Sequence, residues 1–478
     1  MKRTATIACM LFLTHDVFAQ SSLFQRAPGD PANGAVNPAP TEVAAVAEYP
    51  VSIDIRSVAS ATKTITVAQP DGTNRVFTQK FFDPLEGFVI DEEFDAVPDP
   101  KVPDEKLRYR WYGLDKTGQL LLSVGEGRVS GTMIVPGAIF SIVNDGEGKH
   151  TYRQSDPTRF PSELPVSAEV SDKRAVEYAP LPAPGAQKSL VTVDMLVLYT
   201  PAVLALAGSA EAVTSRVDEA IAQTNTSFTQ GGAFHLRVRN VLESQTLRAE
   251  ELNYPETNSQ SCPFPTDPND CRYYGHKVAL RANATAQARR TATNADLVVM
   301  LVADTRSCGN SYVQSTNCGV NQQFGNDEPG CDVGTAYKPF AFGVVTWSCA
   351  TAMQDFAHEV GHMFAMAHNP ENFPHMPFFP WAFAHWSFNQ QESVVSNRGR
   401  FGQCGTCTKA LQFSNPDLPF VNFPATPSGT TGRFNARIGA HFAQTMSDYF
   451  LPDTTERVFW HGFEQLPCTS TGTDCHGL

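Results

Sequence analysis

The stretch HEVGHMFAMAHN, residues 358–369, places three histidines and one glutamate in a short, largely apolar run. In a helix, His358 and His362 are four residues apart, so both imidazoles lie on one face, one turn apart. That separation suits two ligands of a single zinc ion. Glu359 falls at the edge of the same face, where its carboxylate can reach a water on the metal without binding the metal itself. The stretch therefore predicts a metal site on a helix.

The flanking residues support this helix. Thr351 and Gln354 fit a capping box, which predicts that the helix begins there. Neutral imidazoles would leave the zinc its full charge and bring the pKa of a bound water down to about 7. Glu359 could then take that proton and pass it to a leaving amine. The apolar side chains that would face the core at helical spacing are Met353, Phe356, Ala357, Val360 and Phe364.

The third histidine requires a change of chain direction. On a straight helix His368 would lie about 240° round the axis from His362, pointing away from the metal. Asn369 and Pro370 end any helix at that point, so the chain must leave the helical path near Ala365. We expect a turn at Ala365 that makes His368 the third ligand. If the helix instead ran straight, the candidate replacements would be Glu371, Glu392, His375 and His385.

Composition limits the classes of partner. The chain has 478 residues, of which 42% are hydrophobic, enough for a large core and for two or three domains. Its formal net charge of -13 argues against nucleic acid or an anionic membrane surface as the main partner, because both attract basic patches. The charge does not identify a substrate.

The N-terminus has the layout of an export signal. In MKRTATIACMLFLTHDVFAQ, two basic residues precede a short apolar run, and Val17-Phe18-Ala19 precede Gln20. This order is typical of a secretory signal peptide, which we place at residues 1–19. The run is too short to anchor the chain in a bilayer, so no integral membrane segment is expected after signal removal. We expect a secreted protein, extracellular or periplasmic in transit.

The cysteines fit an oxidising compartment. Ten of the eleven lie at or beyond Cys262, and in an exported protein such residues are expected to pair as disulfides. For Cys404 and Cys407, a structural disulfide is favoured over a redox or zinc role. The sequence does not fix the connectivity, although local loops are plausible for Cys262 with Cys271 and for Cys468 with Cys475.

The chain divides into regions of different pattern. Residues 20–181 contain no cysteine and read as irregular sequence followed by short alternating strands, which favours a small β-rich N-terminal region. A Pro-rich stretch at 182–190 reads as a linker, and residues 451–478 read as a C-terminal appendage. Residues 191–450 alternate strands with helices, which indicates an α/β layer. The expected strands include VTVDMLVLYT (191–200), FHLRVRNV (234–241), ADLVVMLVAD (295–304) and AFGVVTW (341–347).

The motif resembles that of the metzincins, HExxHxxGxxH, with Ala365 at the position of the glycine. Further segments are similar to the bacterial peptidyl-Asp metalloendopeptidases, relatives of the reprolysins, over roughly residues 188–450. They are VDMLVLYTPA, ADLVVMLV followed by Cys308-Gly309, FGVVTWSCAT, and Phe413-Ser414-Asn415-Pro416-Asp417. The individual pieces are short, but they occur in the family's order.

The resemblance implies a secreted zinc endopeptidase that acts on protein or peptide substrates. Its catalytic domain would be α/β (α+β), with a twisted mixed sheet, an active-site helix below the cleft and an edge strand that pairs with extended substrate. His358, His362 and His368 would bind Zn2+. Glu359 would be the general base for a zinc-activated water. The β-rich N-terminal region would be a prodomain, and it could not block zinc with a cysteine because it has none.

Two departures from the family pattern support an alternative function. Ala365 would need a backbone shape that costs a residue with a side chain about 1 kcal/mol or more. The methionine that metzincins place beneath the metal is also missing, since the corresponding GRFGQC has Phe401. The alternative is a catalytically weakened secreted binding or inhibitory protein on a metzincin-like fold. The presence of all three histidines and Glu359 favours the enzyme.

Overall fold

The structure is a computed structural model of the whole chain. It describes residues 21–24, 44–60, 63–91, 96–144, 150–161, 190–256, 268–314, 334–370, 379, 381–387, 391–396 and 407–450. The predicted signal peptide, the appendage and all of the predicted linker except Leu190 lie outside these residues. Those assignments therefore stay predictions.

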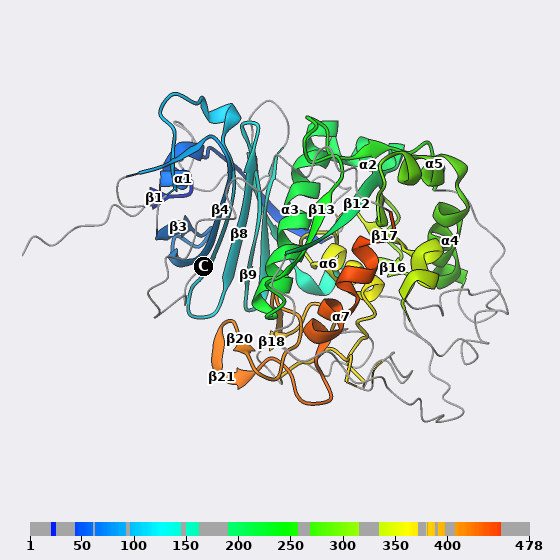
Figure 1. The fold of residues 1–478 in the computed structure, drawn as a ribbon. Helices are drawn as coiled ribbons and strands as arrows, with labels where there is room; N and C mark the ends of the chain where they lie inside the picture. Colours follow the sequence, from blue (N-terminus) through cyan, green and yellow to red (C-terminus); the bar gives the residue numbers. More distant parts are fainter. Residues whose placement is uncertain are drawn as a thin grey trace, which may run out of the picture.

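The N-terminal region is built on one large sheet (Figure 1). Within the described residues this sheet has nine strands, in the order β1-β3-β4-β7-β8-β9-β10-β11-β2. Antiparallel pairing runs without interruption from β3 to β2. The strands are β1 (Ser21–Ser22), β2 (Ala45–Val51), β3 (Thr64–Ala68), β4 (Asn74–Glu86), β7 (Arg108–Leu114), β8 (Gln119–Gly125), β9 (Arg128–Val135), β10 (Ala138–Asn144) and β11 (His150–Ser155). The remaining elements are α1 (Ile55–Ser60), the β5 (Phe88–Ile90) and β6 (Ala96–Pro98) pair, and two 3-10 turns, η1 (Asp104–Lys106) and η2 (Pro157–Arg159).

Strand β8 is buried on both faces, because its alternating side chains pack against two different parts of the protein. Leu120, Leu122 and Val124 point into the core of the N-terminal region itself. Leu121 points to the opposite face, where it joins an apolar cluster with residues from beyond position 190. An antiparallel sheet commonly leaves one face to water. Here that face packs against the rest of the protein.

The second region contains a mixed sheet in the order β13-β12-β15-β17-β16, with β14 also pairing β12. All of these pairs are parallel except β16 with β17, which is antiparallel and lies at the edge. The structure confirms the four strands expected from the sequence, with slightly shorter bounds. The strands are β12 (Val191–Tyr199), β13 (Leu236–Asn240), β14 (Glu250–Glu251), β15 (Leu297–Val302), β16 (Gly309–Ser311) and β17 (Phe342–Thr346).

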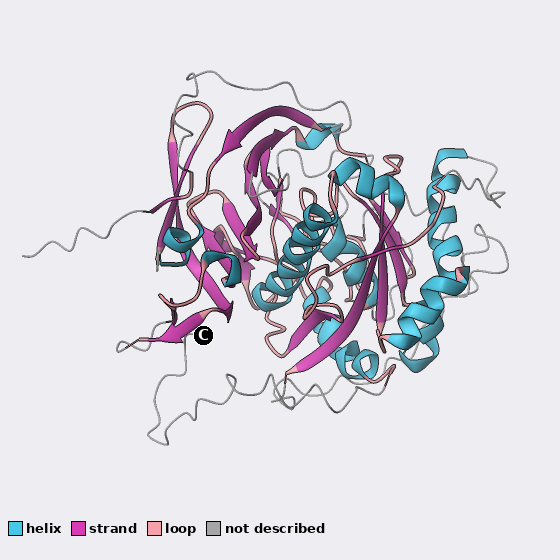
Figure 2. Cartoon of the chain, turned by 90° about the horizontal axis from the view of Figure 1, so that it is seen from above, coloured by secondary structure: helices cyan, strands magenta, loops and turns pink. Residues whose placement is uncertain are grey.

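Helices cover both faces of this sheet (Figure 2). Every residue of β15 is buried as a result, as expected for a central strand flanked by helices on both sides. No helix in the described part of the chain is both long enough and apolar enough to cross a membrane. The helices are α2 (Pro201–Ala207), α3 (Ala210–Gln230), α4 (Pro268–Ala282), α5 (Ala284–Ala292), η4 (Gly334–Phe340), α6 (Asp355–Met363) and α7 (Asn435–Ser447). Two short strand pairs complete the region: β18 (Gln391–Glu392) with β19 (Thr408–Lys409), and β20 (Pro419–Phe420) with β21 (Phe423–Pro427).

The two regions meet where the N-terminal sheet lies beside helix α3 (Figure 1). Tyr112 and Leu121 from the sheet pack with Ala222 of α3 and with Leu411. Polar contacts surround this apolar cluster. Ser130 Oγ donates to Ser215 O at 2.7 Å, and Arg248 Nη2 donates to Glu126 Oε1 at 2.9 Å. The regions therefore share one well-packed interface that joins apolar burial to specific hydrogen bonds.

Glu219 of α3 is the acidic group buried in this interface. Thr132 of β9 donates a hydrogen bond to its carboxylate, and Gln223 donates another at 3.4 Å. Burial raises the pKa of Glu219 to about 7, although Thr132 and Arg216 oppose that change. The folded-state pKa thus lies above the unfolded value of about 4.3. The contribution of Glu219 to stability is therefore fully present below about pH 4.3 and is lost as the pH rises through about 7.

Replacing Glu219 with glutamine should remove this pH dependence. Between about pH 5 and pH 8, we expect the free energy of unfolding of the wild type to fall by roughly 2 to 3 kcal/mol relative to the Glu219→Gln protein. Urea titrations of both proteins at the two pH values measure this difference. Parallel stability curves for the two proteins would contradict it.

Candidate metal centre

Helix α6 carries His358 and His362 and starts later than the sequence suggested. The predicted capping box is wrong, because the helix begins at Asp355 and Gln354 is its N-cap without a side-chain capping bond. Residues 348–353 form turns instead. The Gln354 side chain donates to Lys409 O at 3.2 Å, and the disulfide between Cys308 and Cys349 ties these turns to the start of β16. Contacts with distant residues therefore hold the start of α6 in place of the predicted capping box.

The structure brings all three histidines together. The Nε2 atoms of His358 and His362 lie 2.9 Å apart, as expected for residues one helical turn apart. His368 Nε2 lies 3.0 Å from His358 Nε2 and 2.9 Å from His362 Nε2. All three side chains are buried. One small, enclosed space thus receives three imidazole nitrogens.

A tight reversal after the helix returns His368 to the other two histidines. Ala365 has φ +65°, the left-handed conformation. Its N–H donates to His362 O at 2.9 Å, and Met366 N–H donates to Gly361 O at 3.0 Å. These two bonds form a Schellman motif, in which the left-handed position is usually glycine. Alanine adopts the same shape here at a cost of about 1 to 2 kcal/mol. The helix therefore ends at Met363, and the straight-helix alternative is excluded.

Backbone carbonyls orient two of the rings. His358 Nδ1 lies 3.0 Å from Val394 O, and His362 Nδ1 lies 2.7 Å from Met366 O. A carbonyl oxygen only accepts, so each Nδ1 carries the proton, and in an uncharged ring the lone pair is then on Nε2. Burial, followed by the nearby His362 and Lys409, holds the pKa of His358 well below its ordinary value. The lone pairs therefore face inward, where they would repel one another without a cation.

This donor set fits a catalytic metal. Three neutral imidazoles with converging Nε2 atoms are the protein ligands of one common type of catalytic zinc site, which leaves a further position open. The carbonyl partners of His358 and His362 match the usual second contact of metal-binding histidines. The structure contains one further cluster of this kind among its described residues, Cys308, Cys349 and Asp355, but a disulfide joins its two cysteines.

The Glu359 side chain extends from helix α6 to the edge strand β16. Ser311 Oγ of β16 donates to Glu359 Oε2 at 2.6 Å and lies 3.0 Å from Glu359 O. At Gly309 the fit is so close that a Cβ would lie 2.3 Å from Glu359 Oε1. Lys277 of α4 supports the same strand, with Nζ 3.4 Å from Ser311 O. Strand β16 thus fixes the position of the Glu359 carboxylate.

The other candidate ligands are not part of this cluster. Glu392 and His385 are described, but neither belongs to a group of described residues that could hold a metal. His385 stacks on Phe420, with ring centroids 5.9 Å apart. Glu371, His375 and Phe401 lie outside the described residues, so the floor of the site predicted around Phe401 is not tested. The predicted disulfides of Cys404 with Cys407, Cys262 with Cys271, and Cys468 with Cys475 are also not tested, because at least one cysteine of each pair lies outside the described residues.

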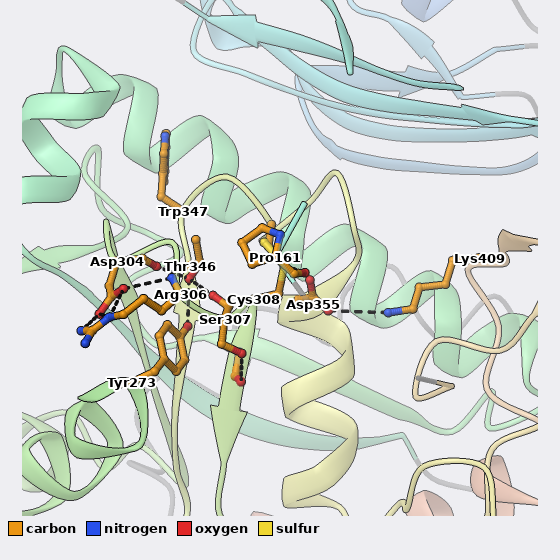
Figure 3. The surroundings of a disulfide bond; sticks show 12 residues. Pro161, Tyr273, Asp304, Arg306, Ser307, Cys308, Thr346, Trp347, Asp355 and Lys409 are labelled. Carbon is orange, nitrogen blue, oxygen red and sulfur yellow. Dashed lines mark hydrogen bonds and ion pairs between the residues drawn. A yellow bond between two sulfur atoms is a disulfide. The ribbon is translucent and has the colours of Figure 1, made fainter. Parts of the chain in front are cut away.

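The N-terminal region also reaches this part of the molecule. Its last described residue before position 190 is Pro161, whose carbonyl oxygen lies 3.2 Å from Cys308 Sγ (Figure 3). The disulfide between Cys308 and Cys349 therefore has the N-terminal region on one side and the start of α6 on the other. Sequence reasoning missed Ser311, Val394 and this disulfide pairing. Of these features, only Cys308 had a signal in the sequence, because Cys308-Gly309 is among the segments similar to the family.

Comparisons with known proteins show which enzymes this chain resembles. Residues 189–409 match the Reprolysin_5 family, described as Metallo-peptidase family M12. A Xanthomonas campestris peptidyl-Asp metalloendopeptidase is 25% identical over 80% of this chain and 81% of its own length. A Pseudomonas aeruginosa protein of the same name is 27% identical over 52% of this chain and 38% of its own length. A third, from Stenotrophomonas maltophilia, is 23% identical over 65% of this chain and 66% of its own length.

The strain at Ala365 can be measured with a matched pair of variants. Ala357 in α6 and Ala365 are both fully buried, but only Ala365 has a positive φ. Each change to glycine removes one methyl group. Ala357→Gly also places glycine inside a helix, at a cost of about 1 kcal/mol, while Ala365→Gly relieves the left-handed backbone. We therefore expect Ala365→Gly to be more stable than Ala357→Gly by about 2 to 3 kcal/mol in denaturant titrations of the metal-free protein. A difference of about 1 kcal/mol or less would contradict the strained turn.

Proposed function

We propose that this metalloendopeptidase is zinc-dependent and that His358, His362 and His368 are the zinc ligands. The premise is that residues 189–409 form a reprolysin-like metallopeptidase domain. The convergence of three buried Nε2 atoms at 2.9 to 3.0 Å is the observation that carries this proposal. Carbonyl groups that hold Nδ1 of His358 and His362 support it further. The alternative of a binding or inhibitory protein is not favoured, because the relatives are named as endopeptidases.

Glu359 is proposed as the general base. When bound, zinc supplies Lewis-acid activation of water and of the scissile carbonyl. Glu359 is next to His358 in sequence, and its carboxylate is held by Ser311 and covered closely by Gly309. From that position it would accept a proton from the attacking water and later deliver it to the leaving amine. Burial of the site limits access of bulk water and strengthens these charge interactions.

Cleavage beside aspartate is proposed on the relatives' name alone. The proteins from Xanthomonas, Pseudomonas and Stenotrophomonas are each named peptidyl-Asp metalloendopeptidase. Among the described residues, β16 is the edge strand of this sheet and runs antiparallel to β17, which supports binding of an extended peptide along it, since a strand edge can offer backbone hydrogen bonds. Sequencing the products of a digested unstructured protein reveals the preference. Cuts without enrichment of aspartate at either side would contradict it.

Changing Glu359 to glutamine tests the mechanism. Glu359→Gln should lower the rate of peptide cleavage at least 100-fold, on the order expected for losing a general base, while zinc binding stays intact. A chelator should abolish wild-type cleavage. Glu219→Gln is a matched control, because Glu219 is equally buried but contacts the N-terminal region. Undiminished cleavage by Glu359→Gln would refute the proposed role of Glu359.

Ser311 is proposed as a positioning residue for Glu359. Removing the hydroxyl with Ser311→Ala should reduce kcat by roughly 10-fold with little change in KM, because a charge-assisted hydrogen bond is lost while the substrate contacts remain. Ser311→Thr keeps a hydroxyl and should restore most of kcat. Steady-state kinetics on an internally quenched peptide measures both values. A drop in Ser311→Thr equal to that in Ser311→Ala would show that packing, and not the hydrogen bond, is responsible.

A further inference from the structure

Gln119 connects the N-terminal region to a backbone segment of the peptidase region. It is the first residue of β8, and its side chain is 1% exposed. Gln119 Nε2 donates to Lys409 O at 2.6 Å, and Gln119 Oε1 accepts from Leu411 N at 3.1 Å. Tyr112 OH lies 3.3 Å from the same Oε1 atom. One side-chain amide thus pairs with two backbone groups of one segment, as a neighbouring strand would.

The segment held by Gln119 also contacts the start of the active-site helix. Lys409 O accepts a second hydrogen bond, from Gln354 Nε2 at 3.2 Å. Lys409 Nζ lies 3.6 Å from Asp355 Oδ1, the first residue of α6, in the contact drawn in Figure 3. The backbone and side chain of Lys409 therefore both connect the interface to the beginning of α6.

From the same segment, hydrogen bonds continue to a histidine of the metal centre. Gln412 directly follows Leu411, and Gln412 O accepts from Val394 N at 3.1 Å. Val394 O is in turn the partner of His358 Nδ1 at 3.0 Å. A short path of backbone and hydrogen bonds thus leads from Gln119 through Leu411, Gln412 and Val394 to His358.

The surroundings of Gln119 make this connection costly to break. Tyr112, Leu121, Ala222 and Leu411 form the apolar cluster around the amide. In such an environment, loss of the acceptor for Leu411 N–H is not compensated by water, whereas Lys409 O keeps the hydrogen bond from Gln354. Loss of Gln119 would therefore favour rearrangement of residues 409–411. Val394 would move with them, because Gln412 holds its N–H.

We propose that Gln119 is a positioning residue for the metal centre, holding the backbone of residues 409–412 so that Val394 presents its carbonyl to His358. The N-terminal region then supports the centre from the side of α3 and residues 409–411, without supplying a ligand. This inference rests on the proposed zinc-binding function. It also gives residues 44–161 a role in the folded enzyme that does not depend on blocking the cleft.

Gln119→Leu in the full chain tests the proposal, with Ser130→Ala as the matched control. Leucine fills a similar volume but loses both hydrogen bonds to residues 409 and 411. Ser130→Ala also removes an interface hydrogen bond, to Ser215 O of α3, that does not lead to residues 409–412. In competition with a chromophoric chelator, we expect Gln119→Leu to bind zinc roughly 10-fold more weakly than wild type. Ser130→Ala should bind zinc as wild type does.

Hydrogen exchange of the metal-free proteins gives a second readout. The amides of Leu411 and Val394 should exchange faster in Gln119→Leu than in Ser130→Ala, while amides of β3 should not differ between the two. Gln119→Met loses the same two hydrogen bonds but keeps an unbranched side chain of similar length, so its zinc affinity should fall as in Gln119→Leu. This variant decides the matter if Gln119→Leu does not fold.

Equal zinc affinity and equal exchange in Gln119→Leu and Ser130→Ala would overturn the proposal. A wild-type protein that binds no zinc would instead overturn the proposed function. In that case the exchange of Leu411 and Val394 still decides whether Gln119 holds this segment. The two failures are therefore distinguishable.

Discussion

Three imidazole rings bring their Nε2 atoms to within 2.9 to 3.0 Å of one another in one buried space, an arrangement that a bound cation would make favourable. Much of the peptidase region is arranged around this constraint. Helix α6 supplies two rings at the spacing of one turn, and the Schellman turn at Ala365 supplies the third. Carbonyl groups of Val394 and Met366 then fix which nitrogen faces inward. The positive φ of an alanine is accepted because the three rings must meet.

The sequence predicted those parts of the site that depend on local geometry. The spacing of His358 and His362 defines a helical face by itself, and Asn369-Pro370 required the chain to turn before His368. The start of the helix was predicted wrongly, because the Gln354 side chain bonds Lys409 O and does not complete a capping box. Ser311 and Val394 could not be predicted, since they come from a short polar edge strand and from a loop whose positions depend on the whole fold.

The N-terminal region was predicted to be β-rich, and its strands alternate as that pattern requires. What the pattern could not reveal is that β8 buries both of its faces. Leucines at alternate positions serve two different partners, the core of the N-terminal region and helix α3. Apolar residues on both faces of an antiparallel strand are therefore a sign of docking, and the buried Gln119 at the start of that strand marks where the docking becomes specific.

The contacts of the metal centre differ greatly in the length of chain that they close. The Nε2 pairs of the three histidines join residues only 4, 6 and 10 positions apart. The hydrogen bond from Ser311 to Glu359 spans 48 positions, and the bonds of Gln119 span 290 and 292. Since the entropy lost on closing a loop grows with its length, the histidines can gather at lower cost than the contacts that Ser311 makes to Glu359 and Gln119 makes to residues 409 and 411. The three rings can therefore approach one another early in folding, before the N-terminal region docks and fixes their final positions.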